Sequence, residues 1–379
     1  MIIVYYPLSI IHYSSPVGTP IGRPPIHLRT PSAPLIGELS AQLTEGLSYH
    51  KNHTPPFCFA ASLLRTPMIP RTPPKKSNPK GEYMKKENYI FALGFFDGVH
   101  LGHQALLRKC TELAAAHNAT PAAMTFAGHP QSAFSATCPS LITSQIDREA
   151  LLRQFGMEYI HTLPVTQAVM STPWEVFLTD LLQIGAAGFV CGHDFRFGRG
   201  GEGNGEKLAV FCARHGLPFA IVPPQTLDGI RISSTHIRSL LEAGRMEEAC
   251  RCLGHPHVLT ARVVPGRQLG RTIGIPTANL AIPQGVAEPR HGVYACKAKT
   301  PEGEFLAVTN VGSRPTVEGH HVTVEPWLLD YSGDLYGKTV TLEFHAFLRP
   351  EQKFDSLEQL QAEIQRNADQ TRQILEDML

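Results

Sequence analysis

The sequence predicts two folded regions, an α/β domain built on a parallel, doubly wound sheet and a β-barrel that ends in one long helix. Two observations support this prediction. From residue 89 to Gly254, short apolar runs alternate with stretches of helical periodicity, as in sheets whose parallel strands are joined by helices. After Gly254 the apolar runs are separated by turns such as PEGE (301–304), which is typical of antiparallel strands.

In the first region, five apolar runs are short enough to be buried strands: YIFALGFF (89–96), PAAMTF (121–126), YIHTLPV (159–165), GFVCG (188–192) and PFAIVP (218–223). Helical periodicity occurs in ALLRKCTELAAAH (105–117), SQIDREALLRQFG (144–156) and STPWEVFLTDLLQIG (171–185). For the last helix we expect Thr172 at the N-cap, Pro173 as the first helical residue and Gly185 at the end. One further helix is expected over residues 234–254.

Five β-rich runs follow: HVLTARVVPG (257–266), GVYACKAKT (292–300), EFLAVTNVG (304–312), HVTVEPWLLDY (321–331) and KTVTLEFHAFL (338–348). They predict antiparallel strands that close a small barrel. The chain then ends in a helix that begins with a capping-box pattern of Ser356 and Gln359. Its apolar stripe consists of Leu357, Leu360, Ile364, Ala368, Thr371 and Leu375.

Residues 1–83 differ from the rest of the chain. They contain 14 of the 31 prolines, each of which lacks a backbone donor and fixes φ. They carry eight Lys/Arg and three Asp/Glu, a net charge of +5. We expect a disordered tail. Met84 is an alternative start of the natural chain, which N-terminal sequencing of the native protein would decide.

The composition argues against nucleic acid, membrane and disulfide chemistry. Residues 84–379 carry 26 basic and 30 acidic side chains, so a polyanion is not an expected partner. No apolar run approaches the roughly 18 residues of a membrane-spanning helix. The eight cysteines contain no CxxC pair. We therefore expect reduced thiols in a cytoplasmic protein that is a monomer or weak oligomer and acts on small molecules.

The stretch GFFDGVHLGHQ (94–104) lies where the first strand is expected to pass into the first helix. In doubly wound sheets this junction binds phosphates, because the N–H groups and dipole of a helix start favour anions. His100 and His103 are one turn apart, and both can donate to the oxygens of a nucleotide triphosphate. Gly94 and Gly102 allow a close backbone approach, and Asp97 belongs to the same phosphate-binding stretch. The alternative is a histidine cap and a histidine bonded within the core.

A second helix start, ISSTHIRSLL (232–241), has the same character. Ser233, Ser234 and Thr235 can cap this helix or offer hydroxyls to a triphosphate. Arg238, one turn further on, can clamp a leaving pyrophosphate through two hydrogen bonds. Taken alone, the pattern also fits an N-cap followed by a solvated arginine.

The run GRGGEG (198–203) matches GxGxxG. We expect no helix directly after it and find no well-placed acid about 20 residues on, so we reject a dinucleotide fingerprint. We interpret the run as a mobile glycine loop over the substrate. The pattern GxxxxGK[ST] does not occur in the chain, which excludes a P-loop.

In the barrel region, GRQLGRTIGIPTANL (266–280) combines glycines with two polar residues. Gly266 and Gly270 suggest a flap or tight turns. Thr277 and Asn279 are two apart on an expected strand, so their side chains should point to the same face. A hydroxyl and an amide oxygen on one face can share a magnesium ion with nucleotide phosphates.

Glu325 is an acid within the otherwise apolar run HVTVEPWLLDY (321–331). A buried carboxylate needs a partner or a chemical role, and general base toward a substrate hydroxyl is one such role. The alternative is an outward-facing glutamate on a half-buried strand. The segment LDYSGDLYG (329–337) that follows is most simply a hairpin turn with flanking strands.

A series of motifs, in this order, resembles the bacterial bifunctional riboflavin kinase/FAD synthetase family: FDGVHLGHQ, HDFRFGRG, ISSTHIR, GRTIGIPTANL, TNVGSRPTV, WLLDYSGDLYG and LRPEQKFDSLEQL. The resemblance covers residues 88–370. It implies a Rossmann-like HxGH nucleotidylyltransferase domain (84–250) and a six-stranded antiparallel flavokinase barrel with a C-terminal helix (251–379). It also implies two ATP-dependent steps. Riboflavin becomes FMN in the barrel, with ADP as co-product, and FMN becomes FAD in the first domain, with release of pyrophosphate.

The resemblance gives each candidate residue a role. At the ATP phosphates of the adenylyl step it implies His100, His103, Arg238, Ser234 and Thr235, together with Gly94, Asp97 and Gly102. At the flavin it implies His129, Asp194 and Arg349. In the kinase it implies Gly266 and Gly270 near the nucleotide, Thr277 and Asn279 at Mg²⁺ and phosphate, and Glu325 as acceptor of the ribityl hydroxyl proton.

The chain departs from the family's common residues at His193, in the GHDF stretch, and at Ala127-Gly128, before the His-Pro pair. Both departures lie outside the two catalytic sets. Two alternatives stay open at this point. Either one of the two modules alone is active, or the chain is a flavin-binding regulatory or storage protein that retains the fold.

Overall fold

The computed structural model describes residues 87–135, 137–266, 274–316 and 319–376. The expectations about residues 1–83 and Met84, and the one about Gly270, lie outside these residues.

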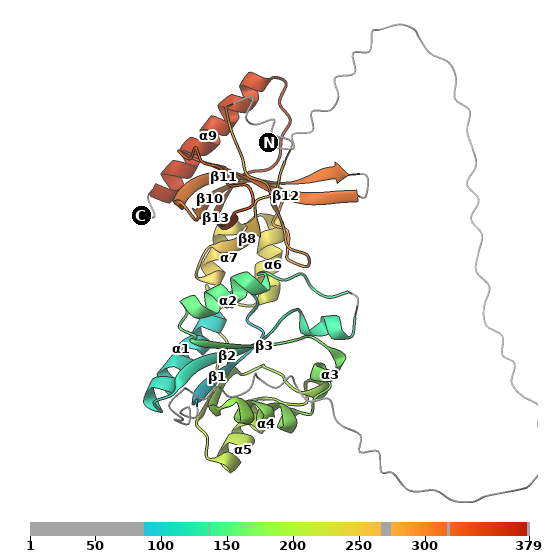
Figure 1. The fold of residues 1–379 in the computed structure, drawn as a ribbon, viewed down its shortest axis with the longest axis vertical. Helices are drawn as coiled ribbons and strands as arrows, with labels where there is room; N and C mark the ends of the chain where they lie inside the picture. The colour runs from blue at the N-terminus through green and yellow to red at the C-terminus, as the bar shows by residue number, and fades with distance from the viewer. Residues whose placement is uncertain (1–86, 136, 267–273, 317–318, 377–379) are drawn as a thin grey trace, which may run out of the picture. The chain divides into compact units, whose positions relative to one another are not determined.

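The α/β region is built on a five-stranded parallel sheet in the order β3-β2-β1-β4-β5 (Figure 1). The strands are β1 (Tyr89–Leu93), β2 (Thr120–Phe126), β3 (Tyr159–Leu163), β4 (Ala186–Gly192) and β5 (Phe219–Val222). Along the chain, β2 and β3 are added on one side of β1, and β4 and β5 are then added on its other side. This reversal creates a switch point at the carboxyl ends of β1 and β4, where doubly wound sheets bind ligands.

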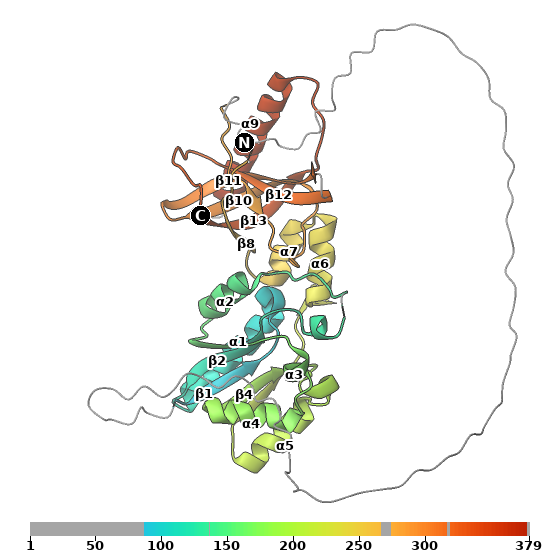
Figure 2. The ribbon, with the colours of Figure 1, turned by 45° about the vertical axis from the view of Figure 1, so that its right-hand side comes forward.

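Helices cover both faces of this sheet because β1 is apolar on both sides (Figure 2). Ile90 and Ala92 pack with α1 (Leu101–Ala116) and α2 (Gln145–Gln154). Phe91 and Leu93 pack with α4 (Trp174–Ile184) and α5 (Gly205–His215) on the other face. The remaining helices are α3 (Gln167–Met170), α6 (Ser234–Ala243) and α7 (Met246–Leu253), with short 3-10 turns η1 (Asp97–Val99), η2 (Pro130–Ala133) and η3 (Arg199–Gly201). The predicted parallel sheet is confirmed.

Three local predictions in this region are wrong. Helix α5 begins directly after the glycine run, with Asn204 as its N-cap, although we expected no helix there. The N-cap of α4 is Pro173 and not Thr172; the Trp174 N–H is instead bonded by Glu202 Oε1 at 3.1 Å. The single helix expected over 234–254 is divided at Gly244, whose φ of 75° ends α6. The predicted helix end at Gly185 is confirmed.

The second region is a six-stranded antiparallel sheet in the order β8-β13-β10-β11-β12-β9. Its strands are β8 (His257–Arg262), β9 (Leu280–Ala281), β10 (Gly292–Thr300), β11 (Gly303–Thr316), β12 (Gly319–Leu328) and β13 (Thr339–Arg349). The Val264 N–H donates to Asn279 O at 2.9 Å, which brings the two edge strands together and nearly closes the barrel. The short hairpin β6 (Thr226–Leu227) and β7 (Ile230–Arg231) forms a separate pair.

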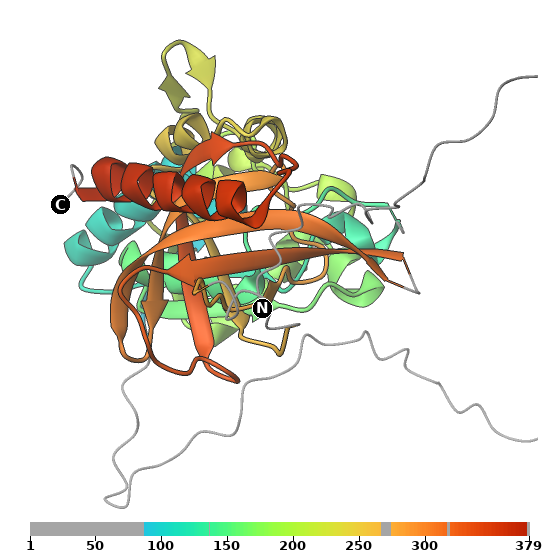
Figure 3. The ribbon, with the colours of Figure 1, turned by 90° about the horizontal axis from the view of Figure 1, so that it is seen from above.

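The C-terminal helix α9 (Leu357–Glu376) lies across the barrel strands (Figure 3). Ala368 packs with Val293, and Leu375 packs with Ala295 and Ala346. Ser356 Oγ accepts from the Gln359 N–H at 3.3 Å, so the predicted cap is present. The predicted barrel with a terminal helix is confirmed.

Within the part of the chain that the structure describes, no helix combines the length and apolar character needed to cross a membrane. Seven cysteines lie in that part, and all are free thiols.

Candidate active sites

The two histidines lie at the switch point of the parallel sheet. His100 is the N-cap of α1, and its Nδ1 accepts from the His103 N–H at 3.3 Å. The two imidazole rings are stacked, with centroids 3.7 Å apart and planes at 11°. Because Nδ1 of His100 is an acceptor, its proton lies on Nε2 in the neutral form.

Burial keeps both imidazoles neutral near pH 7. It lowers the pKa of His100 to about 4 and that of His103 well below its usual value, with the neighbouring His100 adding to the effect on His103. Each neutral ring still carries one N–H, which can donate to an anionic oxygen.

Two adjoining cavities lie beside these rings. The larger has a volume of about 680 Å³ and the smaller about 250 Å³, and both are lined by His103, Leu106, Gly192 and Asp194. Gly94 and several aromatic side chains line the larger cavity: Phe95, Phe126, Phe134, Phe177, Phe195 and Phe197. Gly198, Gly200 and Gly201 also line it, so the glycine run borders the cavity as the sequence suggested.

The smaller cavity is more polar. Its lining includes His100, Gly102, Ser233, Ser234 and Arg231. It therefore lies between two helix starts, that of α1 and that of α6. Two N-terminal helix ends facing one cavity favour an anionic ligand there.

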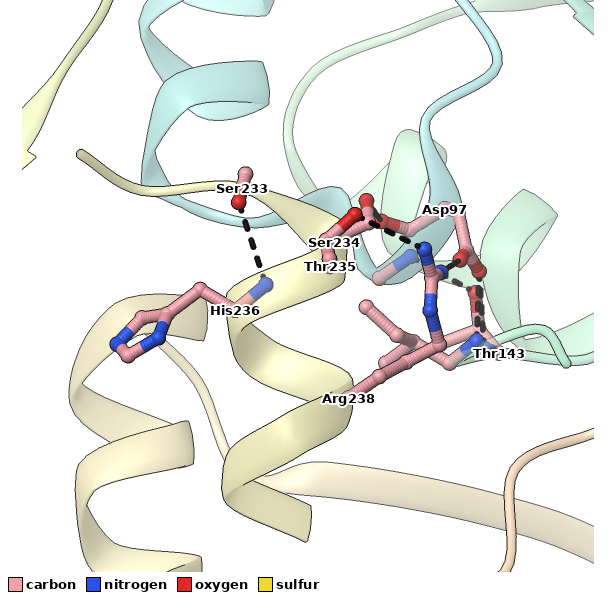
Figure 4. Close-up of polar contacts among 9 residues, drawn as sticks. Asp97, Thr143, Ser233, Ser234, Thr235, His236 and Arg238 are labelled. Carbon is pink, nitrogen blue, oxygen red and sulfur yellow. Dashed lines mark hydrogen bonds and ion pairs between the residues drawn. The ribbon is translucent and has the colours of Figure 1, made fainter. Parts of the chain in front are cut away.

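The start of α6 is tied to the loop after β1 through Asp97 (Figure 4). Arg238 Nη1 donates to Asp97 Oδ2 at 3.0 Å, and Ser234 Oγ donates to Asp97 O at 3.1 Å. Asp97 Oδ1 accepts from the N–H groups of Ile142 and Thr143, at 2.8 and 3.3 Å. Burial raises the pKa of Asp97 to about 6, against the opposing effect of these amides and of Arg238.

Asp97 and Arg238 do not line either cavity. Four hydrogen bonds join Asp97 to Arg238, Ser234 and the backbone of Ile142 and Thr143. Asp97 fixes the Arg238 guanidinium, whose Nη2 also approaches Thr235 Oγ1 at 3.4 Å. Ser233 is the N-cap of α6 and accepts from the His236 N–H at 3.2 Å, which is the capping alternative that the sequence left open.

Two of the residues assigned to the flavin, His129 and Asp194, lie near the larger cavity, whereas Arg349 lies in the barrel. His129 is the N-cap of η2, and its ring meets Phe95 edge-on at 5.5 Å. Burial, and then the charge of Arg238, lowers the pKa of His129. Asp194 lines both cavities and forms an ion pair with Arg231, and the ring of His193 lies 3.7 Å from its carboxylate.

In the barrel, Glu325 faces inward. It is 2% exposed on β12 and pairs in register with Asn310 of β11. Thr323 Oγ1 donates to Glu325 Oε1 at 3.4 Å. The alternative of an outward-facing glutamate is therefore wrong.

Glu325 lines a narrow cavity of about 20 Å³ together with Thr277, Asn310, Arg349 and Asn367. Arg349 is held by Asn367 at 3.0 Å and by Glu363 at 3.3 Å. Glu325, Thr277 and Arg349, which were predicted from separate motifs, thus line one cavity. The amides of Asn310 and Asn367 also line it, and neither was predicted from the sequence. The alternation of strand residues could have indicated Asn310, but nothing local marked Asn367.

A larger cavity of about 470 Å³ lies on the other side of Thr277. Gly274, Tyr331, Asp334 and Tyr336 also line it. The segment 329–337 was interpreted as a hairpin turn, but it forms a wall of this cavity. Thr277 is the residue that lines both barrel cavities.

Unlike Thr277, Asn279 lines neither of the two barrel cavities. Both precede β9, which contains Leu280–Ala281, so the expected strand at 277–279 is wrong. Asn279 is 4% exposed and packs on Gly266, where an added Cβ would lie 2.3 Å from its Nδ2. A residue with a side chain at position 266 would displace the Asn279 amide.

Comparisons with known proteins agree with this arrangement. A family model for FAD synthetase matches residues 82–236, and a model for riboflavin kinase matches residues 253–375. A bifunctional riboflavin kinase/FMN adenylyltransferase of Listeria monocytogenes is 32% identical over 289 residues, 75% of this chain and 92% of the relative. The protein of the same description from Escherichia coli K12 is 35% identical over 288 residues, 74% of this chain and 91% of the relative. A crystal structure from Streptococcus pneumoniae, described as a macrolide-efflux protein, matches with a TM-score of 0.69 and 30% identity, covering 76% of this chain and 95% of that one.

Proposed function

The chain belongs to the bifunctional riboflavin kinase/FMN adenylyltransferase family, and from this premise we propose how its residues divide the two reactions. The protein is a transferase that converts riboflavin to FMN and FMN to FAD, with ATP as co-substrate in both steps. We assign adenylyl transfer to residues 84–250 and the kinase step to residues 251–379. Residues 1–83 have no assigned role in either step.

In the adenylyl step, FMN occupies the larger α/β cavity and ATP the smaller one. The six phenylalanines suit the flat flavin ring, and the two helix starts suit the phosphates. An oxygen of the FMN phosphate attacks the α-phosphorus of ATP, the bond to the β-phosphate oxygen breaks, and pyrophosphate leaves with its electron pair. No proton has to be removed from an ionised FMN phosphate, so the protein mainly stabilises charge.

Charge is stabilised from both sides of the smaller cavity. The side-chain N–H groups of His100 and His103 donate from α1, and the backbone N–H groups of Ser234 and Thr235 donate from the start of α6, since the Ser234 hydroxyl already donates to Asp97 O. Arg238 supplies a positive charge whose direction is set by Asp97. The observation that carries this assignment is the stacked imidazole pair at the sheet's switch point, opposite a second helix start.

In the kinase step, ATP occupies the barrel cavity lined by Tyr331 and Tyr336, and the ribityl chain reaches Glu325 in the narrow cavity. Glu325 accepts the proton of the terminal hydroxyl while its oxygen attacks the γ-phosphorus, and ADP leaves. Thr277 lies between the two cavities, where the transferred phosphoryl group has to pass. Arg349 is positioned to contact the flavin side.

A magnesium ion fits the donor set around Thr277. Its Oγ1 is buried and has no hydrogen-bond partner in the described part of the chain. The lone pairs of this oxygen are therefore available to coordinate a cation. We propose that Thr277 holds the ion together with the nucleotide phosphates; Asn279, which we expected to share it, lines neither barrel cavity. When bound, Mg²⁺ would neutralise phosphate charge during transfer.

The product assay tests the proposed function. Purified protein is incubated with riboflavin, ATP and magnesium, and the flavins are separated by chromatography. FMN together with FAD supports both modules, FMN alone would restrict activity to the kinase, and unchanged riboflavin would favour a flavin-binding protein. The free thiols of the described residues are consistent with the cytoplasmic location that we propose. We also propose a monomer or weak oligomer, and gel filtration of the native protein tests this.

A further inference from the structure

The loop between β1 and α1 has an unfavourable backbone conformation. Phe96 has φ 60° and Val99 has φ 38°, both in the left-handed region that aromatic and β-branched residues rarely adopt. Such strain persists only where surrounding contacts impose it. His100 follows directly, so the contacts that hold this loop also determine where its imidazole lies.

Two buried side chains approach successive carbonyls of this loop. Gln104 Nε2 donates to Val99 O at 2.9 Å and to Leu253 O at 2.6 Å. His255 Nε2 lies 3.0 Å from Gly98 O. Nδ1 of the same ring lies 2.7 Å from Pro256 O, and a carbonyl oxygen can only accept, so the neutral ring donates to one of these two carbonyls. A positioning role at Gly98 requires the tautomer with the proton on Nε2. Gln104 and His255 thus hold the loop at the two residues before His100.

The second half of this support comes from the segment that joins α7 to β8. Gly254 has φ 74°, and an added Cβ there would lie 2.4 Å from Leu101 Cδ2, so the segment's backbone packs directly on the first turn of α1. Leu253 and His255 fall within the range that matches the riboflavin kinase model, 253–375. They lie beyond the range that matches the FAD synthetase model, 82–236.

We propose that Gln104 and His255 are positioning residues for adenylyl transfer. They hold the carbonyls of Val99 and Gly98 so that the strained loop presents His100 and His103 to the nucleotide, and neither side chain lines the cavities. The adenylyl site is therefore completed by a segment that the comparisons assign to the kinase. This inference rests on the role proposed above for His100 and His103.

The test compares two substitutions of His255 in the full-length chain. In His255→Gln the amide Nε2 can reach the position of the imidazole Nε2 and keep the bond to Gly98 O. In His255→Asn the amide reaches only the position of Nδ1, which in the native chain faces Pro256 O at 2.7 Å. We expect the Asn variant to lose about 10- to 100-fold in kcat for FMN to FAD, because small displacements of transition-state contacts are costly. The KM for FMN should change little, and the Gln variant should retain most of the activity.

The kinase step of the same molecules is the internal control and should be unchanged in both variants. Gln104→Met, which keeps the shape without the donor, should behave like His255→Asn. A His103→Ala variant distinguishes a wrong active site from a wrong positioning role. If it keeps adenylyl transfer, the proposed site itself is wrong. If it loses adenylyl transfer while His255→Asn keeps the native rate, the positioning role is wrong. Equal losses in the Asn and Gln variants, or a parallel fall of both activities with the unfolding temperature, would also overturn it.

Discussion

The carboxylate of Asp97 and the guanidinium of Arg238 form a buried ion pair of 3.0 Å, although the residues are 141 positions apart in the chain. Asp97 lies on the loop that leads to His100, and Arg238 lies on α6 (Figure 4). The pair therefore connects the two helix starts that face the smaller cavity. It also explains how Arg238 can be held in place without lining that cavity itself.

Removing one partner of this pair should be costly. Asp97→Ala leaves the Arg238 charge and the amides of Ile142 and Thr143 without their acceptor, and breaking a buried pair costs about 3–5 kcal/mol in the free energy of unfolding. Denaturant titration measures this loss. The exposed pair between Arg251 and Asp228 is the control, and Arg251→Ala should cost no more than about 1 kcal/mol. Similar losses in the two variants would contradict the structural role of Asp97.

The two reactions should be separable by single substitutions. Glu325→Gln removes the proton acceptor of the kinase step and should lower FMN formation about 10²- to 10⁴-fold, while FMN is still converted to FAD. His103→Ala should do the reverse, with a loss of about 10²- to 10³-fold in FAD formation. Each activity is measured separately, with riboflavin or FMN as the starting flavin.

The exposed His117 caps the far end of the same helix α1 and provides the matched control for His103. His117→Ala should leave both activities unchanged. If Glu325→Gln and His103→Ala each reduced both activities to the same extent, the division between the two regions would be wrong.

The Thr277 hydroxyl should matter for activity and not for stability. Thr277→Val keeps the shape and removes a buried oxygen without a partner in the described chain, so stability should stay the same or rise by about 1 kcal/mol. The kinase rate and its dependence on magnesium concentration should fall. Thr341→Val is the opposite control: it breaks the 2.7 Å hydroxyl contact with Thr260 and should leave kinase activity intact. A native magnesium dependence in Thr277→Val would argue against the metal assignment.

Buried histidines should make the fold sensitive to acid. Burial lowers the pKa of His257 to about 4, and it also lowers those of His100, His103 and His255. Between the usual value of 6.5 and the folded value, the unfolded chain binds more protons. Stability is therefore complete above pH 6.5 and is lost as the pH falls toward 4, by up to about 3 kcal/mol for His257.

Asp97 acts in the opposite direction, because its folded pKa of about 6 lies above the usual 3.8 and the folded state binds its proton more tightly between these values. Burial also raises the pKa of Asp147 and Glu351, but it lowers those of His161 and His345 as well. The imidazoles with a lowered pKa outnumber the carboxyls with a raised one, so the net effect of acid should be destabilisation. Unfolding free energies measured from pH 7.5 to 4.5 check this. His257→Asn should flatten the profile, and a profile as steep as that of the native chain would show that His257 does not contribute.

Much of the fold could be predicted because its signals are local. The five parallel strands follow from apolar runs, and the end of α4 follows from Gly185. Where local signals were weak or misleading, a tertiary contact decided the outcome. Thr172 has the right chemistry for an N-cap, but the Trp174 N–H is bonded by Glu202 from the glycine run. That contact could not be foreseen, because it joins residues 28 positions apart.

The candidate sites divide in the same way. His100, His103, Thr277 and Glu325 could be found from residue type and spacing, since each stands out against its own strand or helix start. It could not be predicted that Thr277 and Glu325 share a cavity with Asn310 and Asn367, or that Thr277 also shares one with the segment 329–337. The contact of Asp97 with Arg238 could not be foreseen either, because the two residues lie on separate motifs 141 positions apart.

By itself, the sequence determined the kinds and order of the elements and the chemical groups available, because periodicity, caps and glycine turns act over a few residues. Only the tertiary structure decided which groups meet: Asp97 with Arg238, and His255 with the carbonyl of Gly98. Those contacts depend on how the sheet order brings distant segments together, and no short-range pattern in the chain predicts which distant segments will meet.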